Sequence, residues 1–286
     1  MSTTTIACIG SGNMGFALMQ GIAAVIDGAN IGFADFDSEK AWVAAAAMGA
    51  AVYNSNTEAA EKSSFIFLAV KPQALAGVLA EIAPVVQKRV AEGDAPVLVS
   101  MAAGWTIGRI QAAVSRADIL ATNTFVANVP VARIMPNTPA LISKGIIALT
   151  ASAELSVEKT AELEAMLKKT GVVDRIDECY LDAVTGLSGS GPAFVFLFIE
   201  ALADGGVLAG MPREKALLYA AQTVFGSAAM VMETAKHPGE LKDMACSPGG
   251  TTITGIAALE AGSFRSTVLQ AVKSAWQKAE QLSNSE

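Results

Sequence analysis

The chain has 286 residues, enough for about two domains, and hydrophobic residues make up 52% of it against 16% charged residues. This composition excludes intrinsic disorder and leaves apolar residues to spare for a surface buried between subunits. The net charge of −7 disfavours a nucleic-acid partner, which basic residues would have to hold, but it allows a nucleotide bound by backbone N–H groups.

The first half of the chain alternates short β-branched segments with alanine-rich helical ones. Strands are predicted over residues 5–9, 30–34, 64–70, 96–100 and 131–135. Helices are predicted over residues 14–26, 38–48 and 73–90, the last broken near Pro84. An edge strand over 146–150 and a helix over 156–170 follow, whereas residues 121–130 show no clear pattern. Such alternation indicates βαβ units and an α/β fold with a doubly wound parallel sheet.

The second half of the chain reads as helices alone. Pro192 begins a helix that reaches about residue 208, and proline suits a first helical turn. The segment Gly210-Met211-Pro212 ends it and starts another, which reaches residue 235. Further helices are predicted over residues 241–245, 252–261 and 263–282. We therefore predict an α/β domain over residues 1–172 and an all-helical domain over 173–286.

A glycine-rich motif stands in the first strand-to-helix turn. Gly10-Ser11-Gly12-Asn13-Met14-Gly15 satisfies G-x-G-x-x-G, a weak pattern alone but a strong one directly after a strand and at a helix start. The first glycine allows the tight turn, the second lets a pyrophosphate approach the backbone, and the third lets the helix pack on the sheet. Helix N–H groups then hold the phosphates. These six residues are predicted to bind a dinucleotide in a Rossmann-type domain, and a plain glycine-rich turn is the weaker alternative.

Two carboxylates follow the second predicted strand. Asp35 lies about 20 residues beyond Gly15, where a carboxylate suits the ribose 2′-hydroxyl of NAD and repels the 2′-phosphate of NADP. Asp37 adds to that effect, and no Arg or Lys lies between Asn30 and Glu39. The alternative is that both aspartates simply cap the next helix.

The sequence offers few residues for other chemistry. Its one histidine, His237, lies in a predicted loop, and its three cysteines are far apart, so no catalytic triad, zinc site, other metal site or disulfide framework is indicated. Ketone reduction usually needs a positioned proton donor, whereas an imine nitrogen can take a proton from water. The chain therefore fits imine reduction better than ketone reduction.

A second anion site is predicted where Ser247-Pro248-Gly249-Gly250-Thr251-Thr252 leads into a helix. Free N–H groups there suit a substrate carboxylate, and a threonine hydroxyl could reach its ring nitrogen. An ordinary Ser or Thr N-cap is the equal alternative. The segment from Gly186 to Pro192 also precedes a helix, and alone indicates only a close approach of backbone and helix.

Six segments together resemble one enzyme family. They are I-G-S-G-N-M-G from residue 9, F-L-A-V-K-P-Q at 67–73, M-P-N-T-P at 135–139, D-A-V-T-G-L-S-G-S-G-P-A at 182–193, A-L-A-D-G-G-V at 201–207 and L-K-D-M-A-C-S-P-G-G-T-T-I at 241–253. The chain resembles pyrroline-5-carboxylate reductase over essentially its whole length, and the last two segments are the most specific.

The resemblance implies an NAD(P)H-dependent reductase that makes L-proline from 1-pyrroline-5-carboxylate, the last step of proline biosynthesis. It implies a homodimer formed through the helical domain, commonly assembled further into decamers. It places along the cofactor Asn56, Ala69, Val70, Lys71, Pro72, Ala102 and Ala103. It places at the substrate Ser247, Gly250, Thr251 and Thr252, with Thr252 as the catalytic residue beside the substrate nitrogen. Many relatives carry a small polar or basic residue where Asp35-Phe36-Asp37 stand, so we predict that NADH works at least as well as NADPH.

Two other functions fit the sequence less well. A 3-hydroxyacid dehydrogenase would carry a catalytic lysine on the first helix of the second domain, and the helix from Pro192 to Glu200 has none. A dinucleotide sensor would not need the segment from Ser247 to Thr252. The short polar terminus, Met1–Thr5, and the apolar run of Pro192–Ile199, which is too short for a membrane span, predict a soluble cytoplasmic enzyme with no membrane partner.

Overall fold

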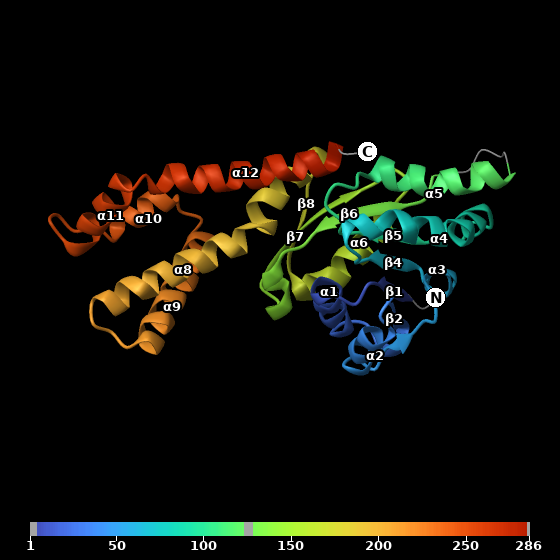
Figure 1. The fold of residues 1–286 in the computed structure, drawn as a ribbon, viewed down its shortest axis with the longest axis horizontal. Coiled ribbons are helices and arrows are strands. Elements are labelled where there is room, and N and C mark those ends of the chain that lie inside the picture. Colours follow the sequence, from blue (N-terminus) through green and yellow to red (C-terminus); the bar gives the residue numbers. More distant parts are fainter. Residues whose placement is uncertain (1–4, 123–127, 285–286) are drawn as a thin grey trace. The chain divides into compact units, whose positions relative to one another are not determined.

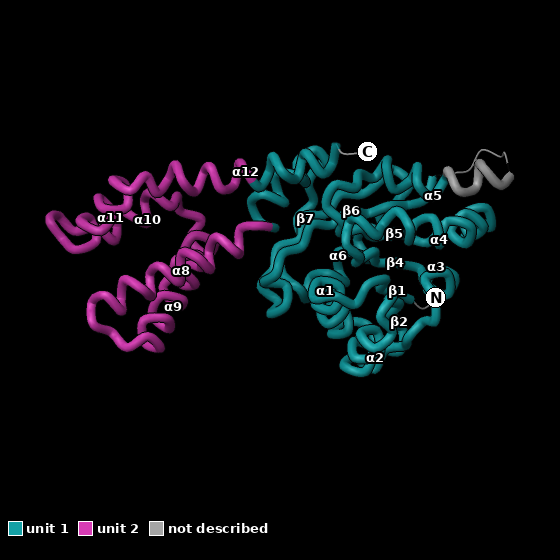
Figure 2. Tube along the Cα trace, in the orientation of Figure 1, with its two compact units in different colours: residues 1–189, 275–286 teal, residues 190–274 magenta. Residues whose placement is uncertain are grey.

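The computed structural model describes residues 5–122 and 128–284 of the chain. Contacts divide the chain into two compact units, residues 1–189 with 275–286 and residues 190–274 (Figure 2). The predicted domain boundary at residue 172 stays a prediction. Most of the polar N-terminal segment, and residues 123–127 of the stretch without a clear pattern, lie outside the described residues.

The first unit contains an eight-stranded sheet with the order β3-β2-β1-β4-β5-β6-β7-β8. Its strands are β1 (Ile6–Ile9), β2 (Ile31–Ala34), β3 (Ala51–Val52), β4 (Phe65–Leu68), β5 (Val97–Ser100), β6 (Val131–Met135), β7 (Gly145–Ala151) and β8 (Gly171–Arg175). All neighbouring strands are parallel except β6 and β7. The strand order reverses between β1 and β4, so a ligand crevice is expected at the carboxyl ends of these two strands.

Helices cover both faces of this sheet (Figure 1). One face carries α1 (Asn13–Ala23), α2 (Ser38–Ala46) and α6 (Val157–Leu167), and the other carries α3 (Asn56–Lys62), α4 (Pro72–Ala91) and α5 (Ile107–Thr122). Alternate residues of β1 enter the two cores, Ile6 and Cys8 on the first face and Ala7 and Ile9 on the second, as the pleat of a strand requires. The doubly wound α/β architecture predicted from the sequence is confirmed.

Several elements differ from the prediction. The two-residue β3 and the seven-residue α3 were missed because such short segments show no periodicity, and α5 and β8 were also missed. The strand predicted as the edge over 146–150 is an inner strand, since β8 lies outside it. The predicted break at Pro84 was wrong, because α4 continues through it with Ile82, Ala83 and Val86 buried on the sheet.

The second unit is helical, as predicted. It contains α8 (Gly191–Leu208), α9 (Arg213–Thr234), α10 (Pro238–Met244), α11 (Thr251–Ala261) and the first part of α12 (Phe264–Asn284). Within its described residues, the buried hydrophobic side chains are those of Ala203, Ala216 and Ala220. Large apolar side chains such as Phe196 and Phe225 are exposed in the single chain. An apolar surface of this kind is typical of a region that binds another protein surface.

One described segment, Glu178–Leu208, is long and apolar enough to cross a membrane, with 6% of the apolar window buried. This differs from the expectation based on Pro192–Ile199, because the longer window meets the criterion despite Glu200 and Asp204. Length and composition are weak grounds for a membrane span, since an apolar helix buried between subunits meets the same criterion.

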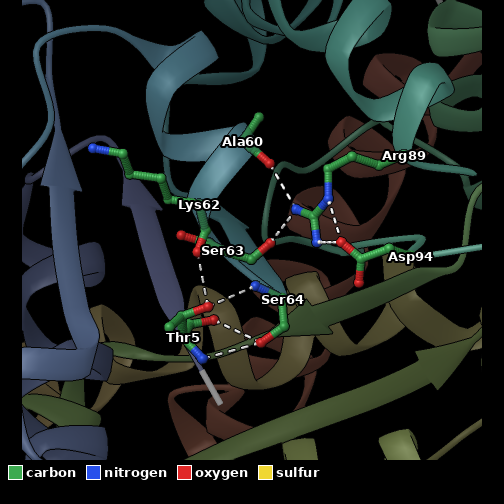
Figure 3. Close-up of polar contacts among 7 residues, drawn as sticks. All are labelled: Thr5, Ala60, Lys62, Ser63, Ser64, Arg89 and Asp94. Carbon is green, nitrogen blue, oxygen red and sulfur yellow. Dashed lines mark hydrogen bonds and ion pairs between the residues drawn. The ribbon is translucent and has the colours of Figure 1, made fainter. Parts of the chain in front are cut away.

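Arg89 ties the end of α3 to the end of α4 (Figure 3). Its Nη1 donates to the carbonyl oxygens of Ala60 at 2.7 Å and Ser63 at 2.5 Å. Its Nε and Nη2 donate to Oδ2 of Asp94 at 3.0 and 2.7 Å. The side chain is only 11% exposed, so these carbonyl groups depend on one guanidinium for their hydrogen bonds.

Arg89→Met is expected to lower the free energy of unfolding by about 2–3 kcal/mol, because it leaves partly buried carbonyl groups without a donor. The melting temperature should fall by roughly 5–10 °C, as measured by circular dichroism. The neighbouring Lys88→Met is the control, since Lys88 is 75% exposed and lies 4.0 Å from Glu92. Equal melting temperatures for the two variants would contradict the role of Arg89.

Candidate functional site

The turn between β1 and α1 and the first turn of α1 each require a glycine. Gly10 has a φ of +100°, and a Cβ there would lie 2.7 Å from the carbonyl oxygen of Ala69. A Cβ on Gly15 would lie 2.4 Å from the carbonyl oxygen of Gly10 and 2.9 Å from Cβ of Ala69. The turn is therefore packed directly against the residue that follows β4, on the two strands where the sheet order reverses.

Gly12 differs from these two glycines because it faces open space. No heavy atom lies within 4 Å of the position that a Cβ would take. Gly12 is also the N-cap of α1, and no side chain of the described residues caps this helix. The first-turn N–H groups of an eleven-residue helix thus face an open approach, which suits the binding of a phosphate.

Asp35 is bound to the glycine-rich turn. Its Oδ2 accepts hydrogen bonds from the backbone N of Ser11 at 2.6 Å and from Oγ of Ser11 at 2.7 Å, and its Oδ1 accepts from the backbone N of Asp37 at 2.9 Å. Burial alone would raise the pKa of Asp35, but these hydrogen bonds outweigh it and the pKa is lowered. The carboxylate is therefore charged at neutral pH.

The structure distinguishes the two roles considered for Asp35 and Asp37, cofactor binding and capping of the next helix. Asp37 is the N-cap of α2, and its Oδ1 accepts from the backbone N of Lys40 at 3.4 Å. Asp35 does not cap α2, because its carboxylate is held by the turn. The capping alternative thus describes Asp37 and not Asp35.

A cavity of about 470 Å³ opens beside the turn and α2. Its lining includes Ser11, Gly12 and Asn13 of the turn together with Asp37 and Lys40. Nζ of Lys40 lies 3.1 Å from Oδ2 of Asp37. Lys40 is not among the predicted cofactor residues, because it lies one residue beyond the segment Asn30–Glu39 that contains no Arg or Lys. Its position in the sequence could have identified it, since Lys40 lies in the first turn of α2, which begins beside the predicted cofactor residue Asp35.

The other predicted cofactor residues follow the same edge of the sheet. Ala69 and Val70 follow β4, Lys71 and Pro72 begin α4, and Ala102 and Ala103 follow β5. Trp105, which is not among the predicted residues, joins two of these loops because its Nε1 donates to the carbonyl oxygen of Pro72 at 3.1 Å. The guanidinium of Arg109 lies 4.3 Å from the centre of the Trp105 ring.

Direct contacts link only part of the predicted set. Ser11 contacts Asp35, and Gly10 packs on Ala69. Asn56 begins α3, and its Nδ2 donates to Oε2 of Glu81 at 2.7 Å. The backbone N of Ala102 donates to Oγ of Ser100 at 3.3 Å. Met14 lies in the first turn of α1.

The predicted substrate residues form the start of α11 in the second unit. Gly250 is the N-cap, and no side chain of the described residues caps this eleven-residue helix. The backbone N of Gly250 donates to the carbonyl oxygen of Ser247 at 3.0 Å, and a Cβ on Gly250 would lie 2.3 Å from Oγ of Ser247. Thr251 and Thr252 are exposed in the first turn. The alternative of an ordinary Ser or Thr N-cap was therefore wrong, and first-turn N–H groups remain open to an anion.

His237 is the N-cap of α10, and its Nδ1 accepts from the backbone N of Gly239 at 3.0 Å. This contact requires an unprotonated Nδ1. The exposed residue therefore stabilises a helix start, which agrees with the expectation of a non-catalytic turn residue.

Two family models match the chain. Residues 178–282 match the model described as pyrroline-5-carboxylate reductase dimerisation, and residues 5–104 match the model described as NADP oxidoreductase, coenzyme F420-dependent. The chain is 40% identical over 283 residues to the pyrroline-5-carboxylate reductase of Escherichia coli K12, with 98% of each chain covered. It is 43% identical over 227 residues to that of Synechocystis, covering 79% of this chain and 78% of the relative.

Solved structures show the same similarity. The pyrroline carboxylate reductase of Plasmodium falciparum with NADP bound has a TM-score of 0.84 and 29% identity, covering 99% of this chain and 100% of the other. The pyrroline-5-carboxylate reductase of Coxiella burnetii has a TM-score of 0.86 and 29% identity at the same coverage. The similarity thus extends over both units.

Proposed function

The chain belongs to the pyrroline-5-carboxylate reductase family. We infer that it catalyses the reduction of 1-pyrroline-5-carboxylate to L-proline. It is an oxidoreductase with a pyridine nucleotide cofactor. One observation carries this function most directly: a glycine-rich turn with an open approach and a second helix start without a side-chain cap occur in the same chain.

The residues of the first unit fit a dinucleotide. The open space at Gly12 and the uncapped start of α1 suit a pyrophosphate, and Asp35 offers a charged carboxylate beside the turn. We assign cofactor binding to Gly10, Ser11, Gly12, Asn13, Met14, Gly15, Asp35, Asn56, Ala69, Val70, Lys71, Pro72, Ala102 and Ala103. When bound, the reduced nicotinamide supplies the hydride for the imine carbon.

The residues at the start of α11 would hold the substrate. The N–H groups there and Oγ of Ser247 suit its carboxylate, with Gly250 keeping the backbone accessible, and the hydroxyl of Thr252 is assigned to the ring nitrogen. The nitrogen takes its proton from water, so these residues mainly bind, orient and exclude bulk water. Thr252 is accordingly the proposed catalytic residue.

We propose a homodimer formed through the second unit. The match to the dimerisation model and the exposed apolar side chains of α8 and α9 support it, because a partner copy would cover them. Further assembly into a decamer, a cytoplasmic location, and the absence of membrane and nucleic-acid partners belong to the same proposal. Burial of Glu178–Leu208 between copies would also explain its length and apolar character.

Turnover is measured as the loss of absorbance of the reduced nicotinamide when the whole protein is supplied with cofactor and the cyclic imine. Oxidation of cofactor that depends on the imine supports the function. Binding of cofactor without turnover by either nucleotide would instead identify a dinucleotide sensor.

NADH is expected to give a kcat/KM at least equal to that of NADPH. Asp35 is fixed and charged beside the turn, where a ribose hydroxyl can donate to a carboxylate and a 2′-phosphate is repelled. Steady-state kinetics with both cofactors at saturating imine measure this ratio. A large advantage for NADPH would defeat the prediction.

A further inference from the structure

We propose that the ion pair between Asp37 and Lys40 adds to the cofactor preference given by Asp35, with Asp37 masking a lysine that would otherwise bind the 2′-phosphate of NADPH. The inference rests on the proposed function in one respect, because it takes the cavity beside Gly12 as the place of the adenosine ribose. It adds a specificity-determining pair to the residues assigned above.

The geometry places both groups of the pair on that cavity. Asp37 and Lys40 line it together with Ser11, Gly12 and Asn13, and Nζ of Lys40 lies 3.1 Å from Oδ2 of Asp37. The hydrogen bond to Asp37 raises the pKa of Lys40, and the pKa of Asp37 is lowered, so both groups are charged at neutral pH. Lys40 thus lines the cavity, and its ammonium is neutralised by the neighbouring carboxylate.

The surrounding charges explain why Asp37, and not Asp35, controls whether Lys40 can bind a phosphate. Among the described residues that line the cavity, Lys40 is the one cation, and Glu39 is a further carboxylate. Asp35 also acts on Lys40, but Ser11 and the backbone N of Asp37 already donate three hydrogen bonds to it. The Asp37 side chain is held by the exposed ammonium of Lys40 and by the backbone N–H groups at the start of α2, that of Lys40 at 3.4 Å.

The ion pair between Asp37 and Lys40 is also weak enough for Lys40 to bind another anion in place of Asp37. The side chains of Lys40 and Asp37 are 66% and 37% exposed, and an exposed pair of this kind contributes little to stability. A phosphate dianion is a stronger partner for an ammonium than a single carboxylate is. Lys40 would therefore turn to a 2′-phosphate once the negative charge of Asp37 is removed.

The test measures binding of two fragments to the whole protein by calorimetry. Asp37→Asn keeps a good N-cap for α2 and removes only the charge. We expect this variant to bind 2′,5′-ADP about tenfold more tightly than the wild type, the effect of one charged hydrogen bond. Its affinity for 5′-ADP should change by less than about twofold, since that fragment has a free 2′-hydroxyl in place of the 2′-phosphate.

Two further variants complete the design. In Asp37→Asn/Lys40→Met the gain for 2′,5′-ADP should disappear, because the gain requires the ammonium. Glu162→Gln removes the matched pair of Lys159 and Glu162, which has the same spacing, lies at 2.8 Å on α6 and does not line the cavity. It should leave both affinities unchanged.

The outcomes separate this inference from the proposed function. If the wild type binds 5′-ADP but Asp37→Asn gives no selective gain for 2′,5′-ADP, or if the gain survives Lys40→Met, the pair has no part in selection. If neither fragment binds any variant, the dinucleotide site itself is refuted, and the proposed function fails with it.

Discussion

Gly12→Ala is expected to weaken NADH binding by about a hundredfold, or roughly 2.7 kcal/mol, while leaving the melting temperature unchanged. The reason is that a Cβ on Gly12 meets no protein atom within 4 Å but would occupy the space through which a pyrophosphate approaches the backbone. Fluorescence titration with NADH and a thermal melt measure the two effects. Wild-type affinity in this variant would show that the turn does not hold the cofactor.

Gly15→Ala, three residues further along and in the first turn of α1, gives the matched contrast. Its Cβ would lie 2.4 Å from the carbonyl oxygen of Gly10 and 3.1 Å from Sγ of the buried Cys8, so the backbone of β1 or α1 must shift. We expect a loss of about 3 kcal/mol or more in the free energy of unfolding. A lower melting temperature for Gly15→Ala but not for Gly12→Ala would separate the packing role from the binding role.

Thr252→Ala is expected to lower kcat with the imine by about ten- to a hundredfold, with little change in the dissociation constant of NADH. Thr252 is exposed in the first turn of α11, where we propose that its hydroxyl meets the ring nitrogen, and it lies outside the unit that contains the glycine-rich turn. Stopped-flow turnover and NADH titration give the two quantities. Equal losses in both would count against the assigned role.

Two variants of the same helix sharpen this test. Thr252→Ser keeps the hydroxyl and should restore most of the turnover. Thr254→Ala removes a hydroxyl that already donates to the carbonyl oxygen of Gly250 at 3.0 Å, so it should change kcat by less than about threefold. A loss in Thr254→Ala as large as that in Thr252→Ala would indicate a general weakening of the helix start.

The local parts of the fold followed from the sequence. Apolar β-branched runs marked β1, β2, β4, β5 and β6, and glycine and proline marked the helix starts. Elements such as β3 were missed because a strand of two residues exists only through its partner β2. The continuity of α4 through Pro84 depends on burial against the sheet, which outweighs the local preference of proline.

Contacts between distant residues could not be predicted in the same way. The end of α12 joins the first unit because it packs on two glycines far away in the chain. A Cβ on Gly186 would lie 2.7 Å from the backbone N of Trp276, and one on Gly104 would lie 2.7 Å from the carbonyl oxygen of Leu282. Nothing in the local sequence of α12 indicates these partners.

The candidate site likewise contains features that the local sequence predicts and features that depend on contacts between distant residues. The glycine pattern and the carboxylates after β2 are local signals, and they predicted the turn that Asp35 joins. The different tasks of Asp35 and Asp37 depend on where Ser11 and Lys40 lie in three dimensions. Asn56, Ala69 and Ala102 came from the family resemblance alone, and their contact with a cofactor stays a prediction.

Hydride transfer from the nicotinamide ring to the imine carbon is tested most directly by isotope labelling. The whole protein is supplied with 1-pyrroline-5-carboxylate and NADH that carries deuterium at the transferable position, and the product is analysed by mass spectrometry and NMR. We predict L-proline with one deuterium on the ring carbon that was the imine carbon. Absence of proline, or proline without the label, would contradict the account.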